Sequence, residues 1–191
     1  MGRALLTWMC WFLLTATSVF FQGSVALGDD ASEDVGGLPK AFIAGELREN
    51  VKMANKPFFD LSGKEFSAKD FEGRVLVVAF WAPWSLESVA LLRELQAIWD
   101  HLNQKEIKDK ITFLPISYGD RHAVRSFCKE YGISMTVYLD EGRALFDYFN
   151  VRAIPLTLIV DRGGLVLYRI DGNVKWDGVD VIGKLLSIAS Q

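Results

Sequence analysis

The chain has 191 residues, half of them hydrophobic, which allows one domain with a sizeable core. Its formal net charge of −3 gives no basic surface that would gather phosphates, so nucleic acid is not expected as a partner. Two cysteines, Cys10 and Cys128, are too few for a disulfide scaffold, and the sequence carries no metal-ligand cluster, so no metal or other cofactor is expected.

The N-terminal segment has the pattern of an export signal. Arg3 precedes a mostly apolar, uncharged run over residues 4–21, and small residues then lead to Ala26. This predicts a signal peptide over residues 1–26 and an extracytoplasmic protein, periplasmic or envelope-associated. Because the apolar run approaches the length that spans a bilayer, an uncleaved membrane anchor is the alternative. Residues 27–55 are polar and acidic and are predicted to form a linker.

The predicted domain covers residues 56–191 and starts with a β-hairpin. Its two strands surround the Ser62-Gly63-Lys64 turn. Residues 75–81 then form an unbroken run of β-branched and aromatic side chains, as expected for a central strand buried on both faces. After a turn at residues 82–84, apolar residues recur at helical spacing up to Leu102. A strand therefore leads into a helix, and Ser85 lies at the junction.

This junction carries a resemblance to a known family. The sequence Phe-Trp-Ala-Pro-Trp of residues 80–84, followed by Ser85 and Ser88 at a helix start, resembles the active-site segment of TlpA/ResA-like redoxins. Those proteins are extracytoplasmic thiol-disulfide oxidoreductases with a thioredoxin fold, and they carry Cys-x-x-Cys at the two serine positions. The acidic residue that many relatives carry three positions later falls on Leu91, and a common helix proline falls on Arg93. The resemblance therefore implies a degenerate site with both sulfurs replaced.

The replacement by serine removes the chemistry of the family. A cysteine at a helix N-terminus has a lowered pKa and supplies a thiolate. A serine hydroxyl starts near the pKa of water, about 15.7, so even a large shift leaves it protonated. Neither Ser85 nor Ser88 can form a disulfide. Serine is also a preferred N-cap, and this role is favoured for Ser85 over nucleophilic catalysis because no histidine lies near it in sequence.

The second half of the chain completes the pattern. A strand is predicted over residues 111–117, and a helix beginning near His122 and ending at Gly132 places Cys128 on its core face, which favours a structural over a redox role. A strand over residues 136–139 and a helix over residues 144–149 are similar to the insertion that distinguishes TlpA-like proteins from thioredoxin.

The C-terminal part holds a second family-like motif, residues 151–157. The resemblance implies that Pro155 is a cis-proline ahead of a strand. A hairpin over residues 156–170 and a helix over residues 176–191 follow, the helix with Ile182, Leu185, Leu186 and Ala189 on one face. The predicted fold class is α/β: a thioredoxin-like three-layer fold, with a central mixed sheet flanked by helices, an N-terminal β-hairpin and the TlpA-type helix-strand insertion.

Three hypotheses about function follow. The first, favoured, is a non-enzymatic redoxin relative that binds extended polypeptide without disulfide exchange. The resemblance implies a groove between the motif turn and the cis-proline loop, lined by Trp81, Trp84, Leu86, Ile154 and Pro155. The aromatic residues also suit packing, which is favoured for Trp81, whereas exposure is favoured for Trp84. The second is a thiol-disulfide oxidoreductase or peroxide reductase working through Cys128, which requires an exposed thiol of low pKa. The third is an anchored accessory factor in envelope redox or cytochrome assembly.

Overall fold

The computed structural model describes residues 51–103, 109–173, 175–176 and 179–191. The predicted signal peptide and nearly all of the predicted linker lie outside these residues. None of the helices in the described part of the chain is long and apolar enough to cross a membrane. Val51 and Lys52 pair with β8, although they lie before the predicted domain boundary at residue 56.

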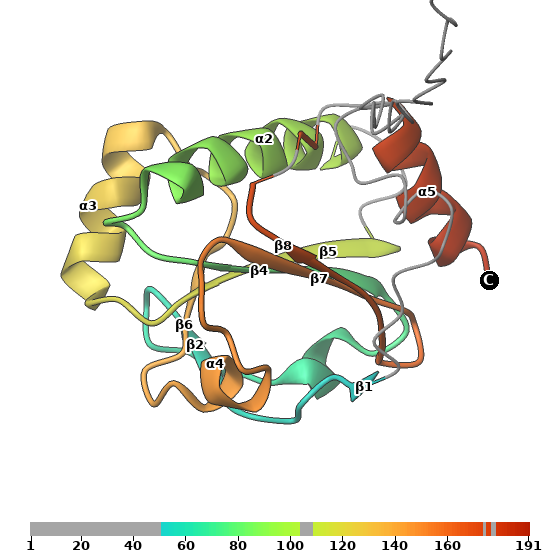
Figure 1. The fold of residues 1–191 in the computed structure, drawn as a ribbon, viewed down its shortest axis with the longest axis horizontal. Helices are drawn as coiled ribbons and strands as arrows, with labels where there is room; N and C mark the ends of the chain where they lie inside the picture. Colours follow the sequence, from blue (N-terminus) through green and yellow to red (C-terminus); the bar gives the residue numbers. More distant parts are fainter. Residues whose placement is uncertain (1–50, 104–108, 174, 177–178) are drawn as a thin grey trace, which may run out of the picture. The chain divides into compact units, whose positions relative to one another are not determined.

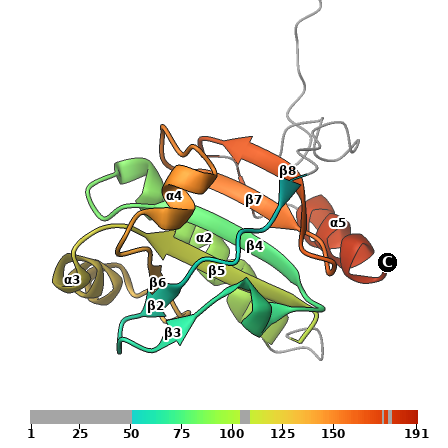
Figure 2. The ribbon, with the colours of Figure 1, turned by 90° about the horizontal axis from the view of Figure 1, so that it is seen from below.

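The described chain forms one mixed sheet of eight strands with helices on both faces (Figure 1). The strands are β1 (Val51–Lys52), β2 (Phe58–Asp60), β3 (Glu65–Phe66), β4 (Val75–Trp81), β5 (Ile111–Ser117), β6 (Tyr138–Leu139), β7 (Leu156–Val160) and β8 (Leu165–Asp171). The helices are η1 (Ala68–Phe71), α2 (Leu86–Asn103), α3 (Arg121–Tyr131), α4 (Ala144–Tyr148) and α5 (Val179–Ala189). The sheet order is β1-β8-β7-β4-β5-β6-β2-β3, which Figure 2 shows from the face opposite α2.

The strand β4 lies at the centre, as predicted. It pairs in parallel with β5 and antiparallel with β7, and all of its side chains are buried. Val77 and Trp81 pack in the cluster that α2, α3 and α5 cover, whereas Val78 and Phe80 pack in the cluster that α4 and η1 cover. A strand covered on both faces needs apolar side chains at every position, which explains why this run shows no alternation.

The insertion differs in detail from its prediction. The strand predicted over residues 136–139 is confined to Tyr138 and Leu139, because only these residues pair with Ile116 and Ser117 of β5. The helix that follows, α4, is present and buries Leu145 and Phe146 against the face of the sheet opposite α2.

The C-terminal helix was predicted to start at Trp176, but Trp176 lies outside α5 (Val179–Ala189). The side chain of Trp176 is fully buried, and its backbone N–H donates to Glu94 Oε2 at 2.8 Å. The buried face of α5 also differs: Leu185 and Ala189 are buried as predicted, together with Val181 and Ile188, while Ile182 and Leu186 are half-buried. Val181 and Ile188 lie at helical spacing from Leu185 and Ala189, and so do Ile182 and Leu186. Packing against the rest of the fold determines which of the two sets is buried.

Candidate functional site

The motif turn leaves the carboxyl end of β4 and enters α2. Ser85 immediately precedes the helix, and its Oγ accepts a hydrogen bond from the backbone N–H of Ser88 at 3.3 Å. This is the geometry of an N-cap, as predicted from the sequence. Ser88 is fully buried, and its Oγ accepts from the backbone N–H of Ala82 at 3.3 Å. The two serines therefore tie the turn to the first turn of the helix.

In the part of the chain that the structure describes, no basic side chain is hydrogen-bonded to the hydroxyl of Ser85 or Ser88. Within the described residues, the hydrogen bonds of the two serine side chains are those to the backbone N–H groups of Ser88 and Ala82. His122 lies exposed in the first turn of α3. Serine needs a neighbouring base to become a nucleophile, so this geometry supports capping and not covalent catalysis.

Two large apolar side chains stand out from the surface at this turn. Trp84 is 60% exposed and Leu86 is 84% exposed. The Trp84 ring meets Tyr118 edge to face, with centroids 5.3 Å apart. A Cβ on Gly119 would lie 3.1 Å from Pro83 and 3.3 Å from the Trp84 ring, so the turn rests closely on the backbone there. Trp84 is thus held in place while most of its surface stays accessible.

The cis-proline loop lies beside the motif turn. The Ile154–Pro155 peptide bond is cis, as the resemblance implied. Phe80 of β4 pairs with Leu156 of β7 in antiparallel register, so the residues just before β7 run alongside those just after β4. Ile154 is half-buried and Pro155 is buried. Sequence segments 70 residues apart therefore meet at one end of the sheet.

The five predicted groove residues divide into surface and support. Trp84, Leu86 and Ile154 supply accessible apolar surface. Trp81 does not: it is fully buried in the core under α2, with its ring centroid 4.9 Å from that of Phe127, as the packing alternative had it. The prediction that Trp81 lines the groove is therefore wrong. Successive side chains of β4 point to opposite faces of the sheet, and both faces are covered, so Trp81 cannot contact a partner.

Two residues of this surface were not singled out from the sequence. Tyr118 follows β5 directly and joins Trp84 to Phe146, and the guanidinium carbon of Arg143 lies 4.2 Å over its ring centroid. β4 and β5 are parallel, so the residues after them meet at the same edge of the sheet. That rule would have placed Tyr118 beside the motif turn, but nothing local in the sequence marks Arg143.

Cys128, the alternative catalytic residue, lies on α3 as a free, half-buried thiol packed against the core. Burial raises the pKa of this thiol from 9.0 to about 11. The predicted core-facing position is thus partly realised, and the thiolate that redox chemistry needs is scarce at neutral pH.

We expect Cys128 to react slowly with a chromogenic disulfide reagent in the native protein. At pH 8 a pKa of about 11 instead of 9.0 lowers the thiolate fraction by about a hundredfold. In a Cys10→Ser background, the native rate should therefore be about a hundredfold below that of the urea-denatured chain, and it should rise about tenfold per pH unit up to pH 10. Equal native and denatured rates would contradict a buried thiol.

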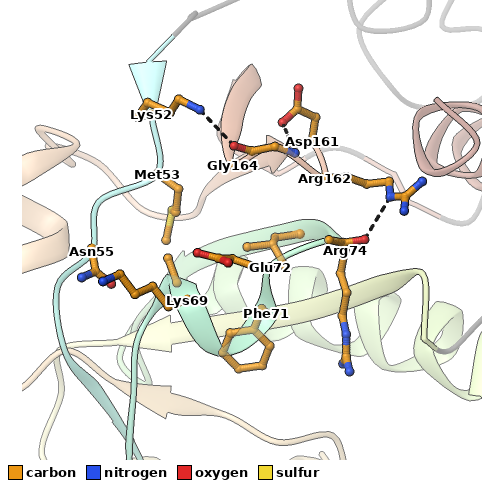
Figure 3. Close-up of a pocket in the computed structure, with 14 residues that line it drawn as sticks. Lys52, Met53, Asn55, Lys69, Phe71, Glu72, Arg74, Asp161, Arg162 and Gly164 are labelled. Carbon is orange, nitrogen blue, oxygen red and sulfur yellow. Dashed lines mark hydrogen bonds between the residues drawn. The ribbon is translucent and has the colours of Figure 1, made fainter.

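A separate cavity of about 410 Å³ lies away from this site (Figure 3). Among the residues that line it, Lys52 Nζ donates to the carbonyl of Gly163 at 3.0 Å and Arg162 Nε donates to the carbonyl of Gly73 at 3.0 Å. Arg74, which directly precedes β4, and Leu76 near its amino end also line the cavity. The cavity is therefore at the opposite end of β4 from the motif turn.

Comparisons with known proteins agree with this arrangement. The model of the AhpC/TSA family matches residues 48–169. The thiol-disulfide oxidoreductase ResA of Bacillus thuringiensis subsp. konkukian (strain 97-27) is 26% identical over 113 residues, which cover 59% of this chain and 64% of the relative. The chain thus spans somewhat less than two thirds of the length of that relative.

Solved structures show the same fold. A DsbE-type thiol:disulfide interchange protein from Chlorobium tepidum superposes with a TM-score of 0.65 at 17% identity, over 75% of this chain and 99% of that one. A secreted Mycobacterium tuberculosis disulfide oxidoreductase, homologous to E. coli DsbE, gives a TM-score of 0.58 at 20% identity, over 70% and 96%. These likenesses confirm the predicted thioredoxin-like α/β fold. With a family model that matches well over half of its length, the chain belongs to the AhpC/TSA family, as a redoxin of the TlpA/ResA-like type.

Proposed function

We propose that this redoxin binds an extended polypeptide at its motif turn and carries out no disulfide exchange there. The observation that carries the proposal is the exposure of Trp84 and Leu86 beside the cis Ile154–Pro155 bond. Large apolar side chains that a fold leaves in water next to one another are typical of a surface that binds a partner. Ser85, which lies between them, and Ser88 supply a stable helix start in place of sulfur chemistry.

Disulfide exchange needs a thiolate and a second sulfur. Ser85 and Ser88 supply neither. The relatives are oxidoreductases by name, which favours the alternative of a thiol-disulfide or peroxide reductase working through Cys128. The half-buried position of Cys128 on α3 and its pKa of about 11 weigh against that alternative.

The class of partner follows from the location that the sequence indicates. An N-terminal export pattern over residues 1–26 suits an extracytoplasmic protein, and one relative is described as secreted. The proposed partner is therefore an envelope polypeptide, including a component of redox or cytochrome assembly. Contact with the membrane enters the proposal only if residues 1–26 remain as an anchor.

The test measures binding of a polypeptide that has no free thiol. The probe is reduced and carboxymethylated insulin B chain, which is unfolded and cannot exchange disulfides. We expect it to bind the full chain, and we expect Trp84→Ser with Leu86→Ser to weaken binding at least about tenfold, since each side chain buries apolar area only in the complex. Val51→Ser, which removes an exposed apolar residue on β1, is the matched control. Equal affinity of the double variant and the control would refute the proposal, and so would the absence of binding.

A further inference from the structure

The strand β5 is paired along its whole length on one side only. β4 pairs with every residue from Ile111 to Ser117, whereas β6 pairs with Ile116 and Ser117 alone. Figure 2 shows β6 beside only one end of β5. The first half of β5 therefore has no partner strand on the side that faces β6. This unpaired, open side is inside the sheet order, away from the edge strands β1 and β3.

The direction of the backbone groups can be read from the register. In a parallel pair, each residue points its N–H and C=O to one neighbour, and the next residue points them to the other. The N–H of Val75 donates to the carbonyl of Lys110 at 2.8 Å, which turns Lys110 and Thr112 toward β4. The N–H of Asp140 donates to the carbonyl of Ser117 at 2.7 Å, which turns Ser117 toward β6.

By the same alternation, Ile111 and Phe113 direct their backbone groups to the open side. No hydrogen bond among the described residues reaches these N–H and C=O groups on that side. Pro115 has the same orientation and lacks an N–H, so it leaves no donor there. Buried backbone groups are nearly always paired, so the open groups of Ile111 and Phe113 call for a partner.

The open side borders a cavity of about 350 Å³ with two unlike walls. Trp99, Leu102 and Met135 form an apolar wall on the face that α2 covers. The opposite wall holds Arg74 and Thr112. Successive side chains of a strand point to opposite faces, so a strand added here would place every second residue against each wall.

The positive charge of Arg74 on the polar wall determines which residues of an added strand would fit opposite it. Arg74 is half-buried, and its Nη1 lies 3.5 Å from Thr112 Oγ1. The ion pairs found among the described residues do not include Arg74. Asp109 also lines the cavity but is exposed in the turn that precedes β5. A guanidinium with free donors in a recess favours a carboxylate opposite it.

We propose that the open half of β5 accepts an added strand from a partner polypeptide in which apolar residues alternate with acidic ones. Main-chain hydrogen bonds to Ile111 and Phe113 would give affinity, and the apolar wall and Arg74 would give specificity. This site lies at the amino end of β5, whereas the motif turn lies beside its carboxyl end. It does not depend on the function proposed for the motif turn.

The test is amide hydrogen exchange by NMR on the full chain, with acetyl-(Val-Glu)3-amide as the probe. In the free protein, the amides of Ile111 and Phe113 should exchange at least tenfold faster than those of Thr112 and Leu114 in the same strand. Saturating peptide should slow Phe113 at least tenfold and leave Thr112 unchanged. Two N-methylated peptides are compared, one methylated at its valines and the other at its glutamates. Since alternate residues of a strand direct their N–H groups to the same neighbour, only one of the two methylations should abolish binding.

A charge exchange tests the polar wall. Arg74→Glu should reverse the preference for an acidic peptide, so that acetyl-(Val-Lys)3-amide binds at least tenfold better than acetyl-(Val-Glu)3-amide. Arg162→Glu is the control, because it makes the same change of charge at an arginine that does not line this cavity. Slow exchange of Ile111 and Phe113 in the free monomer would overturn the proposal, because the chain itself would then cover the edge. Protection that grows with protein concentration alone would overturn it in favour of a second copy. Equal binding of both methylated peptides, or no binding, would also overturn it.

Discussion

Replacing Ser85 and Ser88 together by cysteine should give this protein a disulfide-reductase activity at the motif turn. Ser85 is half-buried at the start of α2, and the N–H of Ser88 already donates to its Oγ, so a thiolate at position 85 would meet a hydrogen-bond donor and the positive end of the helix. Ser88 is fully buried one helical turn away, where a second sulfur can resolve a mixed disulfide.

The measurement is reduction of insulin by dithiothreitol in a Cys10→Ser, Cys128→Ser background. We expect the double cysteine variant to exceed the unmodified rate by about a hundredfold or more, since both the nucleophile and the resolving group are new. Without dithiothreitol, Ser85→Cys alone should attack an insulin disulfide, release one insulin thiol and remain as the mixed disulfide, because it has no resolving sulfur. An inert double variant would show that the missing acid at Leu91, or another departure from the family, also disables the site.

Two tryptophans three residues apart should respond in opposite ways to the same substitution. Trp81→Ala removes a fully buried ring that packs on Phe127 and should lower the free energy of unfolding by about 3–5 kcal/mol. Trp84→Ala removes a ring that is 60% exposed and should change that free energy by less than about 1 kcal/mol. Urea denaturation of both variants and the unmodified chain measures the difference.

The pair also separates stability from binding. Trp84→Ala should weaken binding of the carboxymethylated insulin B chain while the protein stays folded. Trp81→Phe, which keeps an aromatic ring in the core, should recover much of the stability lost in Trp81→Ala and leave binding unchanged. A large loss of stability in Trp84→Ala would mean that this side chain serves the fold and not a partner.

The motif region was predictable because its signals are local. An unbroken apolar run identified residues 75–81 as a strand buried on both faces, and Ser85 could be assigned as the cap from its place before a helical repeat. The cis bond at Pro155 came from the resemblance alone, since a single X-Pro bond is cis only about one time in twenty. Trp81 is the last residue of that strand, and packing is the interpretation that the sequence analysis favours for it.

The sequence by itself thus determined the order of the longer strands and helices, though not β1 or η1, and the role of Ser85 as an N-cap. These depend on side-chain periodicity and on hydrogen bonds between near neighbours. Only the tertiary structure decided which residues meet at the motif turn, which face of α5 is buried and where β6 leaves β5 unpaired. The tertiary structure also decided that Tyr118 lies beside Trp84 at the motif turn, with Arg143 over the Tyr118 ring. Pairing and burial depend on residues far apart in the chain, and a local pattern carries no record of those partners.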